Sequence, residues 1–147
     1  MSLTFDLTGK RVLITGASSG IGFGVAKGFA KAGADLTILS DTAAIHEAAK
    51  ALPGRVRAIE CDIADAAMVT ERLADIEQVD VLINNAGLER PTPLSGENPG
   101  GNDTFERIIA INVTGTQNVT DTLVTRIPDG GRIILTASIW SRTAVPG

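Results

Sequence analysis

The chain contains, at residues 15–22, the stretch Thr15-Gly16-Ala17-Ser18-Ser19-Gly20-Ile21-Gly22. A short apolar run precedes it at 11–15 and a segment of helical periodicity follows at 21–31, so the glycines lie between a predicted strand and a predicted helix. Glycines permit a sharp turn and the close approach of a phosphate to the main chain. The helix N-terminus adds unpaired N–H groups and a partial positive charge. This context favours a phosphate-binding loop over a glycine-rich turn that binds nothing.

Short runs rich in Val, Ile and Leu alternate with longer segments of helical period along the rest of the chain. Strands are expected at 11–15, 35–40, 55–60, 80–84 and 132–137, and helices at 21–31, 42–51, 65–76 and 103–125. Most of these strands are apolar throughout, as in a parallel sheet with both faces covered. Right-handed crossovers then predict an α/β, doubly wound Rossmann-type sheet of order 3-2-1-4-5, in a single dinucleotide-binding domain over 1–147.

Ligands of such sheets bind where the winding reverses, here between the first and fourth strands. The first strand runs into the glycine-rich loop, and the fourth runs into Asn84-Asn85-Ala86-Gly87. Both segments consist of small or polar residues and follow the carboxyl ends of parallel strands. They are therefore predicted to converge on one crevice.

Composition limits the classes of partner. The 147 residues are 44% hydrophobic and carry a net charge of -4 at pH 7, so neither nucleic acid nor membrane is an expected partner. No segment is apolar over the length that spans a bilayer, and neither export nor membrane insertion is expected. The single cysteine, Cys61, excludes an internal disulfide and fits a reducing, cytoplasmic setting. No cluster has metal-ligand spacing, so no metal is expected.

Four motifs together resemble the short-chain dehydrogenase/reductase family. They are the Thr15-Gly16-x-x-x-Gly20-x-Gly22 spacing, residues 84–87, Asn112 in the fourth predicted helix and Ser138 after the fifth strand, in a match running from about residue 9 to the C-terminus. The resemblance implies an NAD(P)-dependent oxidoreductase that interconverts an alcohol and a ketone by hydride transfer. As catalytic residues it implies Ser138, which bonds the substrate oxygen, and Asn112, which holds a water of the proton relay. Capping or kinking a helix is the alternative for Asn112, and ending a strand for Ser138.

The resemblance also implies a set of cofactor contacts. Residues 85–87 would line the ribose side, and Asp62 would accept a hydrogen bond from the adenine amino group, its alternative being an N-cap of the next helix. The predicted cofactor-binding residues are Gly16, Ser18, Ser19, Gly20, Ile21, Gly22, Ser40, Asp41, Asp62, Ile63, Asn85, Ala86 and Gly87.

The choice between NAD and NADP depends on the end of the second strand. The acid that the family uses there falls on Ser40, and Asp41 occupies the next position. A carboxylate at this place repels a 2′-phosphate, and neither Ser18 nor Ser19 is basic. NAD is therefore the expected cofactor and NADP the alternative. In the other interpretation of this position, Asp41 only caps the following helix and Ser40 contacts the ribose.

The end of the sequence departs from the family pattern. The family's general acid/base is a tyrosine with a nearby lysine, downstream of the serine matched to Ser138, whereas this sequence has no tyrosine and stops at Gly147. Its apolar fifth strand would also leave an open sheet edge. A portion of a longer enzyme, inactive alone and lacking further strands and helices after residue 147, is therefore expected. The alternatives are a non-catalytic dinucleotide-binding or sensor module and, less well supported, a nucleotide-sugar or flavin-reducing relative.

Substrate and assembly leave weaker signals. The stretch 91–101 holds three prolines and three glycines and reads as a surface loop. The longer loop 88–102 is expected either to overhang the pocket or only to cover the surface. Trp140 is either an apolar wall for a small-molecule substrate or a core residue. The fourth helix is apolar on more than one face. Because family members commonly pair this helix across a dimer axis, the resemblance implies a homodimer or homotetramer.

Overall fold

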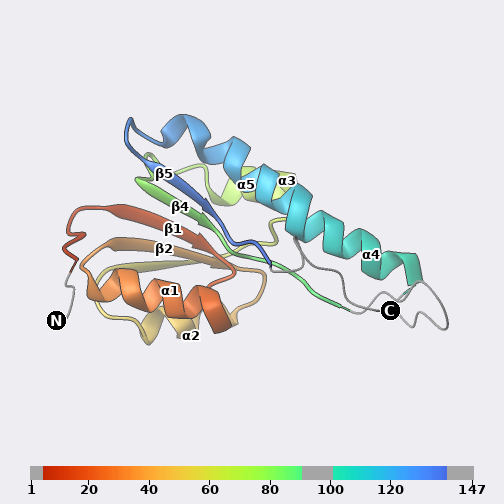
Figure 1. The fold of residues 1–147 in the computed structure, drawn as a ribbon, viewed down its shortest axis with the longest axis horizontal. Helices are drawn as coiled ribbons and strands as arrows, with labels where there is room; N and C mark the ends of the chain where they lie inside the picture. The colour runs from red at the N-terminus through yellow and green to blue at the C-terminus, as the bar shows by residue number, and fades with distance from the viewer. Residues whose placement is uncertain (1–4, 91–100, 139–147) are drawn as a thin grey trace.

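Five parallel strands form one sheet in the computed structural model, which describes residues 5–90 and 101–138 (Figure 1). The strands are β1 (Arg11–Thr15), β2 (Asp35–Ser40), β3 (Val56–Glu60), β4 (Val81–Asn84) and β5 (Arg132–Leu135). Their order is β3-β2-β1-β4-β5, and every neighbouring pair is parallel. The predicted α/β class and the predicted strand order are confirmed.

The helices are α1 (Gly20–Lys31), α2 (Ala44–Lys50), α3 (Ala66–Arg72), α4 (Gly101–Ile109) and α5 (Thr116–Leu123), with the 3₁₀ turn η2 at Val124–Arg126. The helix predicted over 103–125 is interrupted by a π-helical segment, η1 (Ala110–Gly115), which joins α4 to α5. The helix predicted over 65–76 ends at Arg72, where a turn with hydrogen bonds from Leu73 to Val69 and from Ala74 to Glu71 replaces it. Its N-cap is Asp65, whose side chain accepts from the Met68 N–H.

Two helical layers enclose the sheet: α1 and α2 cover one face, and α3 and α5 cover the other (Figure 1). Successive residues of a strand point to opposite faces, and β1 follows this rule. Val12 and Ile14 pack in the cluster with α1 and α2, whereas Leu13 packs in the cluster with α3 and α5. All three side chains are buried. The continuous apolar sequence of the strand is thus explained by burial on both sides.

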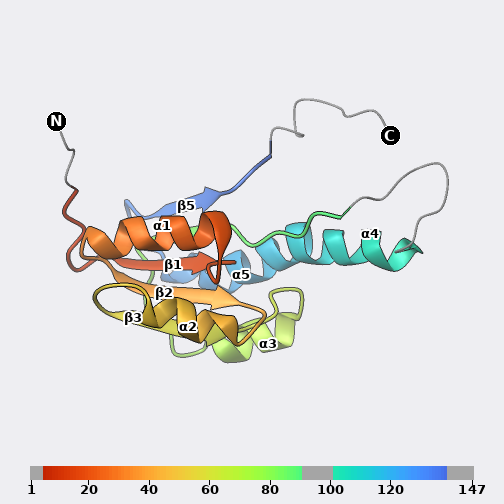
Figure 2. The same cartoon turned by 90° about the horizontal axis from the view of Figure 1, so that it is seen from below.

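The last strand lies at the edge of the sheet (Figure 2). β5 pairs with β4, and in the described part of the chain it has no second neighbour. Ile133, Ile134 and Leu135 are exposed, and neither apolar cluster includes them. The open edge that the sequence predicts is therefore present in the described residues.

The site follows from this topology. The carboxyl ends of β1, β2, β3 and β4 lie along one edge of the sheet, so the segments that follow them come together there. α4 extends beyond this edge, away from the strands (Figures 1 and 2).

Candidate functional site

The glycine-rich loop after β1 has a backbone that other residues adopt only with strain. Gly16 and Gly20 have φ values of 65° and 57°, in the left-handed region. A Cβ added to Gly16 would lie 2.6 Å from the Cα of Ala86, so the loop also touches the segment after β4. Ser19 is the N-cap of α1 but makes no side-chain cap hydrogen bond, which leaves the N–H groups of the first turn available to an anion.

Thr15 and Asn85 fasten the glycine-rich loop to the end of β4. The buried Thr15 Oγ1 accepts hydrogen bonds from the main-chain N–H groups of Asn85 and Ala86, both at 3.0 Å. Asn85 Nδ2 donates to the carbonyl oxygens of Thr15 and Gly16, both at 3.1 Å. Two segments far apart in sequence are thereby held as one wall.

This wall bounds a cavity of about 360 Å³, a size typical of a small-ligand pocket. The structure brings together on it all of the predicted cofactor-binding residues except Gly20, whose place is the turn into α1. Sequence analysis missed Leu39, Cys61, Leu88, Ile111 and Thr136, which also line it. The carboxyl ends of β2, β3 and β5 are signals that could have found Leu39, Cys61 and Thr136. Leu88 and Ile111 carry no such signal.

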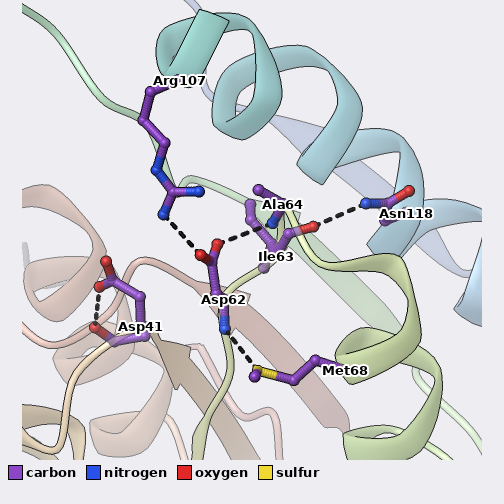
Figure 3. A network of polar contacts seen from close by, with 8 residues as sticks. Asp41, Asp62, Ile63, Ala64, Met68, Arg107 and Asn118 are labelled. Carbon is purple, nitrogen blue, oxygen red and sulfur yellow. Dashed lines mark hydrogen bonds and ion pairs between the residues drawn. The ribbon is translucent and has the colours of Figure 1, made fainter. Parts of the chain in front are cut away.

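The end of the cavity next to the carboxyl ends of β2 and β3 carries the carboxylates of Asp41 and Asp62. The buried Ser40 Oγ lies 3.1 Å from Ser18 Oγ and 3.3 Å from Asp41 Oδ1, so its hydroxyl can donate to either. Asp62 Oδ1 accepts from the Ala64 N–H at 3.0 Å (Figure 3). Its Oδ2 accepts from the Arg107 guanidinium at 2.7 Å. Among the described residues that line the cavity, none carries a cationic side chain.

Asn112 and Ser138 line a second cavity, of about 470 Å³, which shares residues 85–88 and Thr136 with the first. Asn112 lies in the π-helical segment η1, a kind of irregularity frequent at functional sites. Its Oδ1 accepts from the Leu88 N–H at 2.7 Å and its Nδ2 donates to the Leu88 carbonyl at 2.9 Å. The side chain therefore positions the segment after β4, rather than capping its helix.

Asn84, which also lines the second cavity, carries a buried polar atom. Asn84 is 4% exposed, and its Nδ2 donates to Thr120 Oγ1 at 3.0 Å. Its Oδ1 is buried and has no hydrogen-bond partner among the described residues. An unpaired buried carbonyl is unfavourable by about 1–3 kcal/mol.

Trp140 and the loop residues 91–100 lie outside the described residues. Within 5–90 and 101–138, no group of His, Cys, Asp and Glu could hold a metal ion. A search of the same residues finds no helix with the length and apolarity to cross a membrane.

Comparison with known proteins identifies the class of protein. The short chain dehydrogenase profile matches residues 10–147, and the chain belongs to that family. It is 33% identical to 2-dehydro-3-deoxy-D-gluconate 5-dehydrogenase of Pseudoalteromonas atlantica, over 92% of this chain and 56% of that protein. It is 34% identical to gluconate 5-dehydrogenase of Gluconobacter oxydans, over 97% of this chain and 59% of that protein.

Solved structures agree with this assignment. The Pseudomonas aeruginosa RhlG/NADP active-site complex matches with a TM-score of 0.87 and 27% identity, over 100% of this chain and 61% of that one. The 3-ketoacyl-(acyl-carrier-protein) reductase of Brucella melitensis, complexed with NADH, matches with a TM-score of 0.81 and 31% identity, over 93% and 60%. The chain thus spans between half and two thirds of the length of these relatives.

Proposed function

We propose that the protein is an oxidoreductase that interconverts an alcohol and a ketone, with NAD as its hydride carrier. The observation that carries this proposal is the convergence of the glycine-rich loop, Asp41, Asp62 and residues 85–87 on one cavity at the carboxyl edge of the sheet. Membership of the short chain dehydrogenase family supports it. Two structural neighbours, RhlG and the Brucella reductase, were solved in complex with NADP and NADH respectively, which supports a nicotinamide cofactor.

The residues present fit a dinucleotide. The N–H groups at the start of α1 and the hydroxyls of Ser18 and Ser19 would hold the pyrophosphate. Asp41 and Asp62 would hold the adenosine, and residues 85–87 would lie beside the second ribose. When bound, the nicotinamide supplies a site that gives or receives hydride. The two cavities share residues 85–88, and Ser138 lines the second of them.

Ser138 and Asn112 are the residues that we assign to the reaction. The Ser138 hydroxyl would donate to the substrate oxygen, where negative charge develops as hydride leaves or arrives. Asn112, in η1, would hold a water of the proton relay, while its side chain keeps the Leu88 segment in place. Several other polar residues line the second cavity, among them Asn84, Thr116 and Thr136. This lining favours a hydroxyl-rich substrate of the sugar-acid or polyol class, to which the names of the curated relatives refer.

Electrostatics favour NAD over NADP. The cavity presents the carboxylate of Asp41, which belongs to no ion pair among the described residues, whereas the charge of Asp62 is paired with Arg107. Like charges repel by about 4 kcal/mol at a separation of roughly 4 Å and an effective dielectric near 20. A 2′-phosphate beside Asp41 would therefore bind poorly.

Turnover tests the proposal directly. The product of the whole open reading frame should reduce NAD when it is mixed with a panel of sugar acids and polyols, and the absorbance of NADH should rise. In the reverse direction, it should oxidise NADH in the presence of the corresponding ketones, and the absorbance should fall. KM should be at least about tenfold lower for NAD than for NADP, since the repulsion exceeds 1.4 kcal/mol. Tight NAD binding without turnover of any alcohol or ketone would instead support a non-catalytic binding module.

Asp41→Asn is the matched control for cofactor choice, because the amide keeps the shape and removes the charge. KM for NADP should fall towards that for NAD, while the rate at saturating NAD stays near that of the parent protein. An unchanged preference would contradict the role given to Asp41.

Self-association through the α4 and η1 helices is a further part of this proposal. Phe105, Ile109 and Val113 recur at intervals of four along one helical line and are 57%, 40% and 57% exposed. An apolar stripe of this kind typically marks a protein interface. We expect sedimentation velocity to show a homodimer or homotetramer, and Val113→Glu to shift it towards monomer. A parent protein that is monomeric at tens of micromolar would contradict this prediction.

A reducing, cytoplasmic location is proposed from Cys61. Its thiol is buried, and burial is the largest cause that raises its pKa to about 11. The thiol therefore stays protonated and inert at neutral pH. Fractionation of cells that express the protein tests this location.

A further inference from the structure

Beside the Asp62 end of the cavity lies a residue that the family motifs do not include. Arg107, on α4, donates from one guanidinium nitrogen to Asp62 Oδ2 at 2.7 Å, across 45 positions of sequence (Figure 3). Asp62 follows β3 and lines the cavity, whereas Arg107 belongs to the helix that extends beyond the sheet edge. Among the described residues, this ion pair joins α4 to the end of β3 through polar side chains.

The bonding of Asp62 determines what the carboxylate can still accept. Oδ1 is engaged by the Ala64 N–H and Oδ2 by Arg107, while the Asp62 N–H donates to Met68 Sδ at 3.3 Å. A carboxylate has about four lone-pair sites, so about two remain. Because both oxygens are held, the remaining lone pairs have fixed directions. The side chain is 31% exposed, so a ligand in the cavity can reach them.

We infer that Arg107 is a positioning residue that makes Asp62 selective for a base with an amino group, a conclusion that rests on the proposed function. Held by Arg107, Asp62 presents only acceptors to the base. The 6-amino group of adenine satisfies such an acceptor, whereas a 6-oxo base places an oxygen against it. Without Arg107, the Asp62 side chain is fastened on one side only and turns towards water, so the discrimination between the two bases is lost.

The position of Arg107 makes this inference testable without loss of the fold. None of residues 103–109 is buried, and the Arg107 side chain is 42% exposed, so its replacement removes no core contact. The contact is made by one nitrogen, so a lysine can replace it, whereas glutamine lacks the charge. A suitable control is Arg57, which is 45% exposed and pairs with Asp75 at 2.9 Å.

The experiment compares the dissociation constants of NADH and of reduced nicotinamide hypoxanthine dinucleotide, which carries a 6-oxo base. The two probes have the same charge, so loss of a cation from the protein affects both equally and the ratio isolates base recognition. We expect the unmodified protein to prefer NADH by about tenfold or more, as one charge-assisted hydrogen bond allows. R107Q should reduce that preference to about twofold. R107K should retain most of it, and R57Q should leave it unchanged.

A cycle with Asp62 completes the test. In D62A the preference should already be small, and adding R107Q should lower it no further, because the arginine acts through the carboxylate. An R107Q preference equal to that of the unmodified protein would overturn the inference while leaving the proposed function intact. This result would arise if the guanidinium only stacked on the base or only attracted the pyrophosphate. Absence of NADH binding by the unmodified protein would overturn both.

Discussion

Gly22→Ala is expected to weaken NADH binding by on the order of a hundredfold, the value that follows from an overpacking penalty of about 3 kcal/mol. Gly22 is buried in the first turn of α1, directly against the glycine-rich loop. An added Cβ would meet the Gly16 carbonyl oxygen, and would lie 2.5 Å from Asn85 Nδ2 and 2.9 Å from the Gly16 carbonyl carbon. Two of these atoms are backbone, so the loop itself must move.

The added methyl group would also disturb Asn85, which fastens the loop to the end of β4. Asn85 Nδ2 donates to the carbonyl oxygens of Thr15 and Gly16, and the same contacts would be broken by the new methyl group. Fluorescence titration with NADH measures the loss of affinity, and urea unfolding measures the accompanying loss of stability.

Gly24→Ala provides the matched control in the same helix. Gly24 is exposed, has no positive φ, and an added Cβ there meets nothing within 4 Å. Because alanine favours helix over glycine, this variant should be more stable by about 0.5–1 kcal/mol and should bind NADH as the parent does. If Gly22→Ala bound NADH as tightly as Gly24→Ala, the loop would not be the phosphate site.

The second large effect is expected at the amino ends of β1 and β4. Asp80 precedes β4, and its Oδ2 accepts from the Arg11 N–H at 2.8 Å and from Arg11 Nε at 3.1 Å, while Gln78 donates to Oδ1 at 3.1 Å. These hydrogen bonds, that of the Arg11 side chain first, lower the pKa of Asp80 to about 2. Its side chain is 13% exposed, so water screens the pair only partly. Asp80→Asn should therefore destabilise the protein by about 2 kcal/mol at pH 7.

The sign of the pH dependence follows from the lowered pKa. The carboxylate is more acidic in the folded protein than in the unfolded chain, where the pKa is near its ordinary value of 3.8. Its stabilisation is complete well above that value, decreases as the pH falls through it, and is lost once the pH reaches about 2. The difference in urea-unfolding free energy between the parent and Asp80→Asn should thus be largest at pH 7 and visibly smaller at pH 3.

Asp75→Asn distinguishes this contribution from a general effect of charge. Asp75 also has a lowered pKa, mainly through its hydrogen bond from Arg57, but it lies on the surface, where its ion pair contributes little. Its replacement should leave the unfolding midpoint almost unchanged at both pH values. Equal and pH-independent losses in both variants would show that Asp80 does not hold β1 to β4 through its charge.

Much of the fold was open to prediction because it rests on local signals. Apolar strands bounded by glycine and polar residues, with helical periods between them, are read directly from the residues, and handedness rules leave few orders for the strands. The π-helical segment η1 was not predicted. Its residues continue the helical pattern of α4 and α5, and nothing in their sequence marks the extra residue in the turn.

The candidate site shows the same division. Asp62 could be picked out from its place after a strand and from the family resemblance, whereas its partner Arg107 could not. The two are separated by 45 positions and meet only in the folded chain. Likewise, the sequence places Asn112 in a helix but does not reveal that both polar atoms of its side chain bond to the main chain of Leu88. The single-domain boundary over 1–147 and the roles of Ser138 and Asn112 remain predictions.

The sequence by itself determined that a glycine-rich loop between a strand and a helix opens a parallel α/β sheet, because glycine spacing and hydrophobic period act over neighbouring residues. Only the tertiary structure decided how the loop is held and what its walls present. Thr15 clamps the segment after β4 through two main-chain hydrogen bonds, and Arg107 fixes the Asp62 carboxylate. Such contacts depend on the directions and distances of groups far apart in the chain, which are set when the sheet and its two helical layers pack.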